Sequence, residues 1–105
     1  LFVFTAHAAG LPRVMLEAMA CGAPVVASAI SGVTDHIVDR VTGYLVPPRS
    51  PAELEARIVE ALASPERAAV GAAGQRHVHG DLTWARVVEE LIARVYRPLQ
   101  PALAR

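Results

Sequence analysis

The sequence contains no lysine, no asparagine and only one cysteine among its 105 residues. With Cys21 alone it cannot form an internal disulfide, and this composition fits a reducing compartment, so we expect a cytoplasmic protein. No apolar run reaches the roughly 18 residues that a membrane-spanning helix needs. Ten arginines balance ten acidic residues. The chain therefore has no net charge, whereas a general nucleic-acid-binding protein has an excess of basic residues. We expect no nucleic-acid partner.

What the chain does contain is an alternation of two hydrophobic periods. Short β-branched or aromatic runs predict parallel strands at 1–4, 25–28 and 43–46. Apolar residues at helical spacing predict helices at 12–21, 51–63, 65–79 and 84–96, with a helical turn near 34–38. Ser50, Pro51 and Glu53 have the pattern of a capping box with proline at the first helical position. Strands alternating with helices predict an α/β fold with a parallel sheet and right-handed connections.

The helical patterns also predict which side chains are buried. In the helix at 51–63 the inward positions are Leu54, Ile58, Ala61 and Leu62. The last helix carries a strong apolar stripe, and we expect Trp84 to anchor it rather than to serve as a platform for a sugar. Cys21 has no base beside it in sequence and is expected to be a small core residue. We predict one domain over 1–97, followed by a flexible tail at 98–105.

The start of the first helix is a candidate anion site. Pro12 at the first helical position places Leu11 at the N-cap, and leucine has no side-chain oxygen to cap the helix. The amides of Arg13 and Val14 are then predicted to be free at the positive end of the helix dipole, after the flexible Gly10. Such amides suit the diphosphate of a nucleotide. The alternative is an ordinary hydrated helix start.

The run from Gly10 to Ser28 carries a family resemblance. Glu17 begins the segment EAMACGAPVVAS, which resembles the donor-binding motif of retaining glycosyltransferases of the GT-B fold, also called glycosyltransferase group 1. The stretches at 1–4, 32–48 and 83–96 resemble the flanking strand, the following segment and the closing helix. The resemblance implies a three-layer Rossmann-like fold, specifically the second half of the C-terminal domain. It also implies a UDP-, GDP- or ADP-sugar donor and no metal or other cofactor.

The resemblance assigns roles at the helix start. Glu17 takes the position of the glutamate that holds the ribose. Gly10, Leu11, Arg13 and Val14 join it in the predicted donor-binding set because of the helix start described above, not because of the resemblance. A carboxylate accepts two hydrogen bonds, as vicinal ribose hydroxyls require. The alternative partner of Glu17 is Arg13, four residues earlier. Ala9 stands where the family has a glutamate that grips the transferred sugar. No catalytic residue is assigned within this chain.

Other polar residues have less specific patterns. Asp35 and Asp39 flank His36, which suits either a catalytic or metal site or, more simply, the polar face of a short helical segment. His77 and His79 are two residues apart on a predicted helix and should point in different directions. After the second strand, Ser31 and Gly32 either line the nucleotide pocket or only turn the chain.

These observations leave more than one function open. The first is a fragment of a glycosyltransferase that moves a sugar with retention and that needs an N-terminal GT-B domain, so the chain alone should be inactive. The second is a non-catalytic remnant or interaction module that lost the sugar grip at Ala9. A nucleotide-sugar epimerase fragment is a further alternative. With the preceding strands missing, Phe2 and Phe4 would lie at an unpaired sheet edge, where self-association is a hazard.

Overall fold

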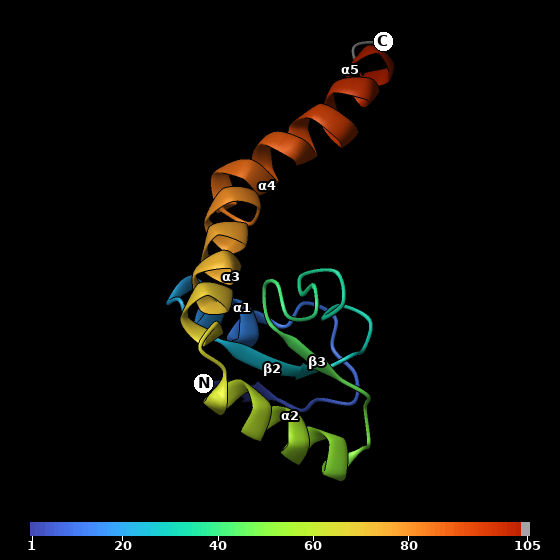
Figure 1. Ribbon diagram of the computed structural model, residues 1–105. Helices are drawn as coiled ribbons and strands as arrows, with labels where there is room; N and C mark the ends of the chain where they lie inside the picture. Colours follow the sequence, from blue (N-terminus) through green and yellow to red (C-terminus); the bar gives the residue numbers. More distant parts are fainter. Residues whose placement is uncertain (104–105) are drawn as a thin grey trace.

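The computed structural model describes residues 1–103, which form an α/β unit followed by a protruding helical arm (Figure 1). The sheet of the unit has three strands, β1 (Phe2–Phe4), β2 (Val25–Ser28) and β3 (Tyr44–Val46). All pairs are parallel and the order is β1-β2-β3, with Phe2 opposite Val25 and Val26 opposite Tyr44. The predicted α/β fold with a parallel sheet is confirmed. Among the described residues β1 pairs only with β2 and is therefore an edge strand.

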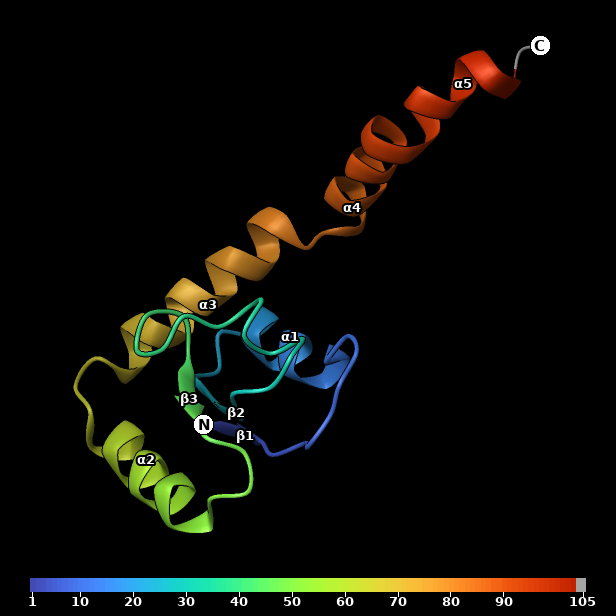
Figure 2. The same ribbon diagram turned by 90° about the vertical axis from the view of Figure 1, so that its right-hand side faces the viewer.

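Helices cover both faces of this sheet. On one face lie α1 (Arg13–Ala20) and α3 (Arg67–Asp81), and on the other lies α2 (Pro51–Ala63), as Figure 2 shows. Successive β2 residues point to opposite faces. Val25 and Ala27 therefore pack with the methionines of α1, whereas Val26 packs toward α2. The result is the predicted three-layer arrangement, with one apolar cluster on each side of the sheet.

α2 begins as predicted, with Pro51 at its first position. The capping-box prediction is wrong, because the side chain of Ser50 makes no capping hydrogen bond. Ala61 is buried, and Leu54 and Ile58 pack against the same cluster. Leu62 is 51% exposed, so its predicted inward position is also wrong. It follows the buried Ala61 by one residue, and a helix turns by about 100° per residue, which rotates its side chain away from the sheet.

Two glycines let α3 pass close to other parts of the backbone. A Cβ atom at Gly71 would clash with the carbonyl oxygen of Gly22, and one at Gly74 would lie 2.7 Å from the carbonyl oxygen of Thr42. Both glycines lower the helix propensity of α3, but they allow its backbone to lie close to the carbonyl oxygens of Gly22 and Thr42. Cys21 lies in the same region, at the C-cap of α1 just before Gly22 turns the chain. Its side chain is exposed, so the predicted core position is wrong.

The arm consists of α4 (Trp84–Leu91), the π-helical segment η1 (Ile92–Tyr96) and α5 (Arg97–Leu103). It points away from the α/β unit in both views (Figures 1 and 2). The radius of gyration is 16.8 Å, against about 13 Å for a compact chain of this length. The protruding arm accounts for this larger value. The segment predicted as a flexible tail, 98–105, is helical as far as Leu103, and residues 104–105 lie outside the described part.

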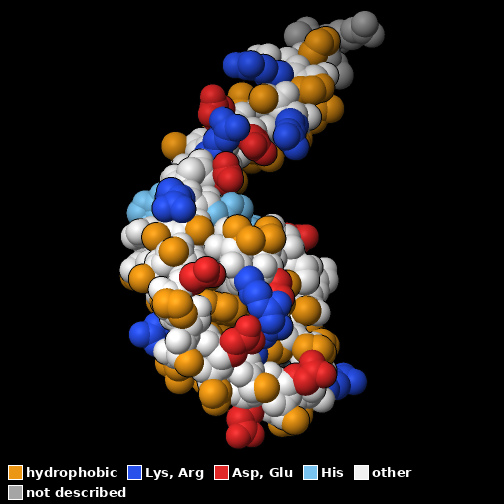
Figure 3. Space-filling model, viewed as in Figure 1, with side chains coloured by type: hydrophobic (Ala, Val, Ile, Leu, Met, Phe, Trp, Pro, Cys, Tyr) orange, Lys and Arg blue, Asp and Glu red, His pale blue; other side chains and the backbone are white. Residues whose placement is uncertain are grey.

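No described element covers the apolar stripe of the arm. Trp84 is 81% exposed, and the hydrophobic residues that follow it along the arm are exposed too. Figure 3 shows them interspersed with charged side chains. The prediction that Trp84 anchors the last helix is therefore wrong, because an anchor needs a surface to pack against. No helix in residues 1–103 combines the length and apolar character that crossing a membrane requires.

Candidate functional site

The candidate site is built around the loop from Thr5 to Pro12, at the carboxyl end of β1. Carboxyl ends of parallel strands are where open α/β sheets bind ligands. The turn after β2 supports this loop from beneath, at the buried Gly32, whose φ is +90°. A Cβ atom there would lie 2.6 Å from the carbonyl oxygen of Gly10 and 2.8 Å from that of Ala9. Gly32 therefore turns the chain and supports the loop, whereas Ser31 is exposed beside it.

The start of α1 differs in detail from the prediction. Arg13 is the first helical residue and Pro12 is the N-cap, with no side-chain capping bond. Pro12 has φ −79° and ψ 74°, and the amide of Arg13 donates to the carbonyl oxygen of Leu11 at 2.9 Å. This is an inverse γ-turn. The prediction of a free Arg13 amide is thus wrong, whereas the Val14 amide has no backbone acceptor among the described residues.

Three of the five predicted donor-binding residues line one groove of about 230 Å³. Leu11, Arg13 and Glu17 lie on one side of it, with Leu16 and Ala20. The four α1 residues among them share a helix face because they are three or four positions apart, whereas Leu11 belongs to the preceding loop. The two remaining predictions, Gly10 and Val14, are exposed but lie outside the groove.

The opposite wall of the groove comes from residues that sequence reasoning missed. Val78 and Leu82 contribute from the end of α3, and Trp84 from the first position of α4. The sequence does indicate that Trp84 begins a helix, because threonine is a favoured N-cap residue. In the structure the Thr83 side chain caps α4 and accepts a hydrogen bond from the Arg86 amide at 3.2 Å. Nothing in the sequence pattern indicates that this helix start lies opposite α1.

Glu17 is the acidic residue of the groove, and it is exposed. No ion pair joins it to Arg13 within residues 1–103, so the alternative partner is not engaged. An arginine that precedes a glutamate by four residues is also the weaker order for a helical pair. The carboxylate is thus available to solvent or a ligand.

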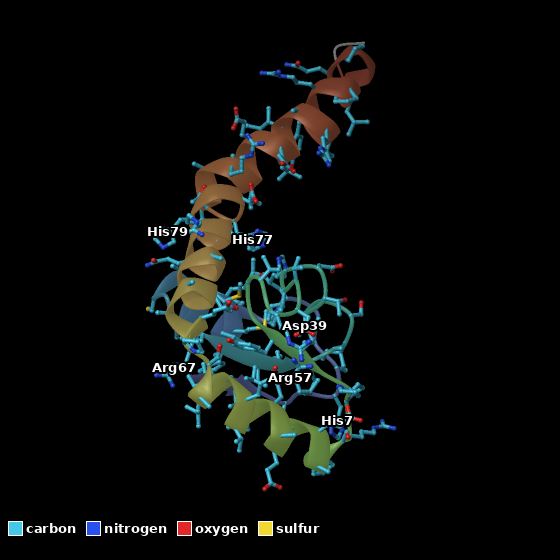
Figure 4. The ribbon with its side chains drawn as sticks, viewed as in Figure 1. His7, Asp39, Arg57, Arg67, His77 and His79 are labelled. Carbon is cyan, nitrogen blue, oxygen red and sulfur yellow. The ribbon has the colours of Figure 1, made fainter. Side chains whose placement is uncertain are left out.

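Asp39, by contrast, has a structural role. Its carboxylate accepts a hydrogen bond from the Leu45 amide at 2.9 Å and lies 3.2 Å from Arg40 Nη1 and 3.6 Å from Arg57 Nη2. Figure 3 shows charged side chains of both signs meeting in this region, and Figure 4 shows Asp39 and Arg57 side by side. These contacts tie the segment before β3 to α2. They favour the simpler of the two interpretations of this polar cluster.

His36 contacts α3 rather than Asp39. Its ring centroid lies 5.8 Å from that of His77. Burial lowers the pKa of His36 from its usual value of 6.5, His77 lowers it further, and Asp35 opposes both effects. His77 also lies 3.3 Å from Asp81, whereas His79 bonds to the carbonyl oxygen of Ala20 at 3.0 Å. The two α3 histidines point in different directions, as predicted (Figure 4).

Comparisons with known proteins point to one family. A family model described as "Glycosyl transferases group 1" matches residues 1–77. D-inositol 3-phosphate glycosyltransferase of Geodermatophilus obscurus is 42% identical over 91 residues, which is 87% of this chain and 20% of that protein. Sucrose-phosphate synthase from Thermosynechococcus elongatus superposes with a TM-score of 0.84 at 34% identity, covering 95% of this chain and 25% of that chain.

A second solved structure was determined with a nucleotide sugar. Anabaena HepE, in complex with UDP-glucose, has a TM-score of 0.68 and 29% identity over 73% of this chain and 22% of that chain. In each of these comparisons the present chain spans between 20% and 25% of the length of its relative. The similarity therefore concerns one part of a larger architecture.

Proposed function

Because this chain belongs to the glycosyl transferases group 1 family, we propose that it forms part of the nucleotide-sugar site of a retaining GT-B glycosyltransferase. The observation that carries the proposal is the groove beside α1, where Glu17 lies exposed on the same face as Arg13. The groove begins at the carboxyl edge of the sheet, which is the ligand-binding edge of such folds. The donor is a UDP-, GDP- or ADP-sugar.

Each donor-binding residue has a definite role in this proposal. The carboxylate of Glu17 accepts hydrogen bonds from the two ribose hydroxyls. The Val14 amide and the guanidinium of Arg13 interact with the diphosphate at the positive end of α1. Gly10 and Leu11 supply the loop backbone that lies against it. The transferred sugar lies near Ala9, which offers no carboxylate. Other residues must therefore supply the hydrogen bonds that hold this sugar.

Transfer requires more than this chain. Stabilising a transition state needs groups on both sides of the reacting bond, and we propose that an N-terminal GT-B domain supplies the other side together with the acceptor site. The chain alone is then inactive. The unpaired edge of β1 is the proposed site of self-association. A cytoplasmic location stays a prediction from the cysteine content.

One observation favours a second candidate function. Ala9 lacks the side chain that would grip a sugar, so the chain could belong to a non-catalytic relative that kept the fold as an interaction module. Such a protein would keep the groove residues without a nucleotide ligand. Nucleotide binding therefore separates the two candidates.

The test is calorimetric titration of the chain with UDP, GDP and ADP. One nucleotide should bind, and Glu17→Ala should weaken it about tenfold, or about 1.4 kcal/mol. Glu55→Ala on α2 is the matched control, since Glu55 is also exposed and lies outside the groove, and it should leave binding unchanged. Binding that both variants weaken equally, or no binding of any nucleotide, would contradict the assignment and favour the interaction module.

A further inference from the structure

A second cavity lies at the same edge of the sheet but on the face covered by α2. It has a volume of about 220 Å³ and shares no residue with the groove beside α1. Its walls include Thr5 and His7 from the loop after β1, Ser28 from the end of β2, and Arg49 and Ser50 from the segment before α2. Figure 4 shows His7 beside the first turn of α2.

Ser28 is the buried polar group of this cavity. It is only 5% exposed, and it faces the α2 side because Val25 and Ala27 of the same strand face α1. Its hydroxyl forms no hydrogen bond with the protein within residues 1–103. It is not among the side-chain atoms that are both sealed from solvent and unpaired in residues 1–103, so it faces the open space of the cavity. A ligand with oxygen atoms in the cavity can accept a hydrogen bond from this hydroxyl.

The remaining polar groups around the cavity are mainly hydrogen-bond donors. Ser50 leaves α2 without a side-chain cap, so the amides of Ala52 and Glu53 have no acceptor from that cap. These two residues do not line the cavity themselves but lie between Pro51 and Leu54, which do. The guanidinium of Arg49 and the His7 ring add donors from the cavity wall. No acidic side chain lines the cavity, and Glu53, the acidic residue of the first turn, is exposed outside it.

Arg49 is unusual in its backbone as well as its position. It has φ +58°, in the left-handed region that non-glycine residues rarely adopt. Arg40 is the other such residue among those described, with φ +63°, and its side chain pairs with Asp39 and Glu60. Arg49 has no ion-pair partner in residues 1–103. Its strained backbone thus places an uncompensated positive charge at the cavity.

We propose that this cavity binds a phosphate group, either as the free ion or as a phosphate monoester. Arg49, the first-turn amides of α2 and the Ser28 hydroxyl provide its hydrogen bonds, and the helix dipole adds a favourable field. The volume lies below the roughly 300–1,000 Å³ of pockets for drug-sized ligands, so it suits a small anion better than a whole nucleotide. The inference does not depend on nucleotide binding beside α1.

The test is an NMR titration of the isotopically labelled 105-residue chain with sodium phosphate at constant ionic strength. The amide signals of Ala52 and Glu53 should shift and saturate. Arg49→Gln should weaken binding about tenfold, and Ser28→Ala about fivefold. Glu53→Gln should strengthen it about twofold, because it removes a like charge near the anion.

Arg76→Gln is the matched control, because Arg76 is an exposed arginine of α3. It should leave phosphate affinity unchanged. Signals that never saturate in the millimolar range, or an equal loss in the Arg49 and Arg76 variants, would overturn the proposal. So would similar shifts at the first residues of α1, α3 and α4.

Two further titrations identify the ligand's source and separate this proposal from the previous one. Tighter binding of glycerol 3-phosphate than of phosphate would support a monoester, and the reverse order would support the free ion. UDP is expected to shift residues 11–17 in addition to any shift that its terminal phosphate causes at residues 49–53, whereas inorganic phosphate is expected to shift only residues 49–53. The titrations can therefore contradict nucleotide binding beside α1 or phosphate binding at this cavity independently of each other.

Discussion

The α/β unit and the arm contain amphipathic helices of similar pattern, yet only those of the unit are covered. In α1, Met15 and Met19 are completely buried against the sheet. In α4, the equivalent apolar positions Val88 and Leu91 remain 46% and 44% exposed. The difference teaches that helical periodicity identifies an apolar face but carries no information about its partner.

The largest expected effect compares one residue from each region. Met19→Ala should lower the free energy of unfolding by about 3 kcal/mol, because it leaves a cavity in a closed core. Leu91→Ala should lower it by less than about 0.5 kcal/mol, because its side chain is already half in water. Urea denaturation followed by circular dichroism measures both. Equal losses would show that the arm's apolar face is covered in solution.

A smaller effect is expected from two glycines of the same helix, α3. Gly71→Ala should destabilise the protein by about 2 kcal/mol, since its Cβ atom would meet the Gly22 carbonyl oxygen. Gly80 has no atom within 4 Å of its Cβ position. Gly80→Ala should therefore stabilise the helix, by about 0.5–1 kcal/mol. Opposite signs of the change in the free energy of unfolding would show that α3 is packed at Gly71 and free at Gly80. The same sign for both variants would contradict this difference between the two ends of α3.

The smallest effect concerns pH. The pKa of His36 is lowered in the folded state, so the unfolded chain binds the proton more readily. The stability from this group is therefore complete above about pH 7 and is lost as the pH falls through 6.5 toward the folded pKa. The arm contains no histidine, so the effect belongs to the α/β unit.

The pH prediction is checked with His36→Gln. Urea midpoints at pH 7.5 and 5.5 should differ less in this variant than in the unchanged chain. His7→Gln is the control, because His7 lies away from the contact between His36 and His77. Its pH dependence should match that of the unchanged chain, and a steeper loss in the His36 variant would refute the assignment.

Much of the fold was predictable because it depends on local rules. Pro51 at the first position of α2 and the β-branched run of β2 each indicate their element without distant contacts. The errors lie where a distant partner decides the outcome. Trp84 was expected to be covered, but it lies at the wall of the groove beside α1 and stays 81% exposed. Leu62 was assigned from helical spacing and Cys21 from residue type, and both lie near helix ends, where the direction of the side chain depends on the exact turn.

The candidate site was predictable in its residues more than in its geometry. The motif at Glu17 correctly indicated a helix at the carboxyl edge of a strand. The γ-turn at Pro12, which occupies the Arg13 amide, depends on one backbone angle that sequence does not specify. The opposite wall, with Val78 and Leu82, comes from residues some sixty positions later. The roles of these residues toward a donor stay predictions.

The contact between Gly32 and the loop after β1 has a consequence for how this site can change over time. The backbone atoms that approach Gly32 are the carbonyl oxygens of Ala9 and Gly10, and the side chain of residue 9 takes no part in this contact. Mutation can therefore exchange that side chain while the loop keeps its path. The family resemblance implies a glutamate at position 9, and Ala9→Glu would introduce that carboxylate on a loop whose close contact with Gly32 involves only main-chain atoms.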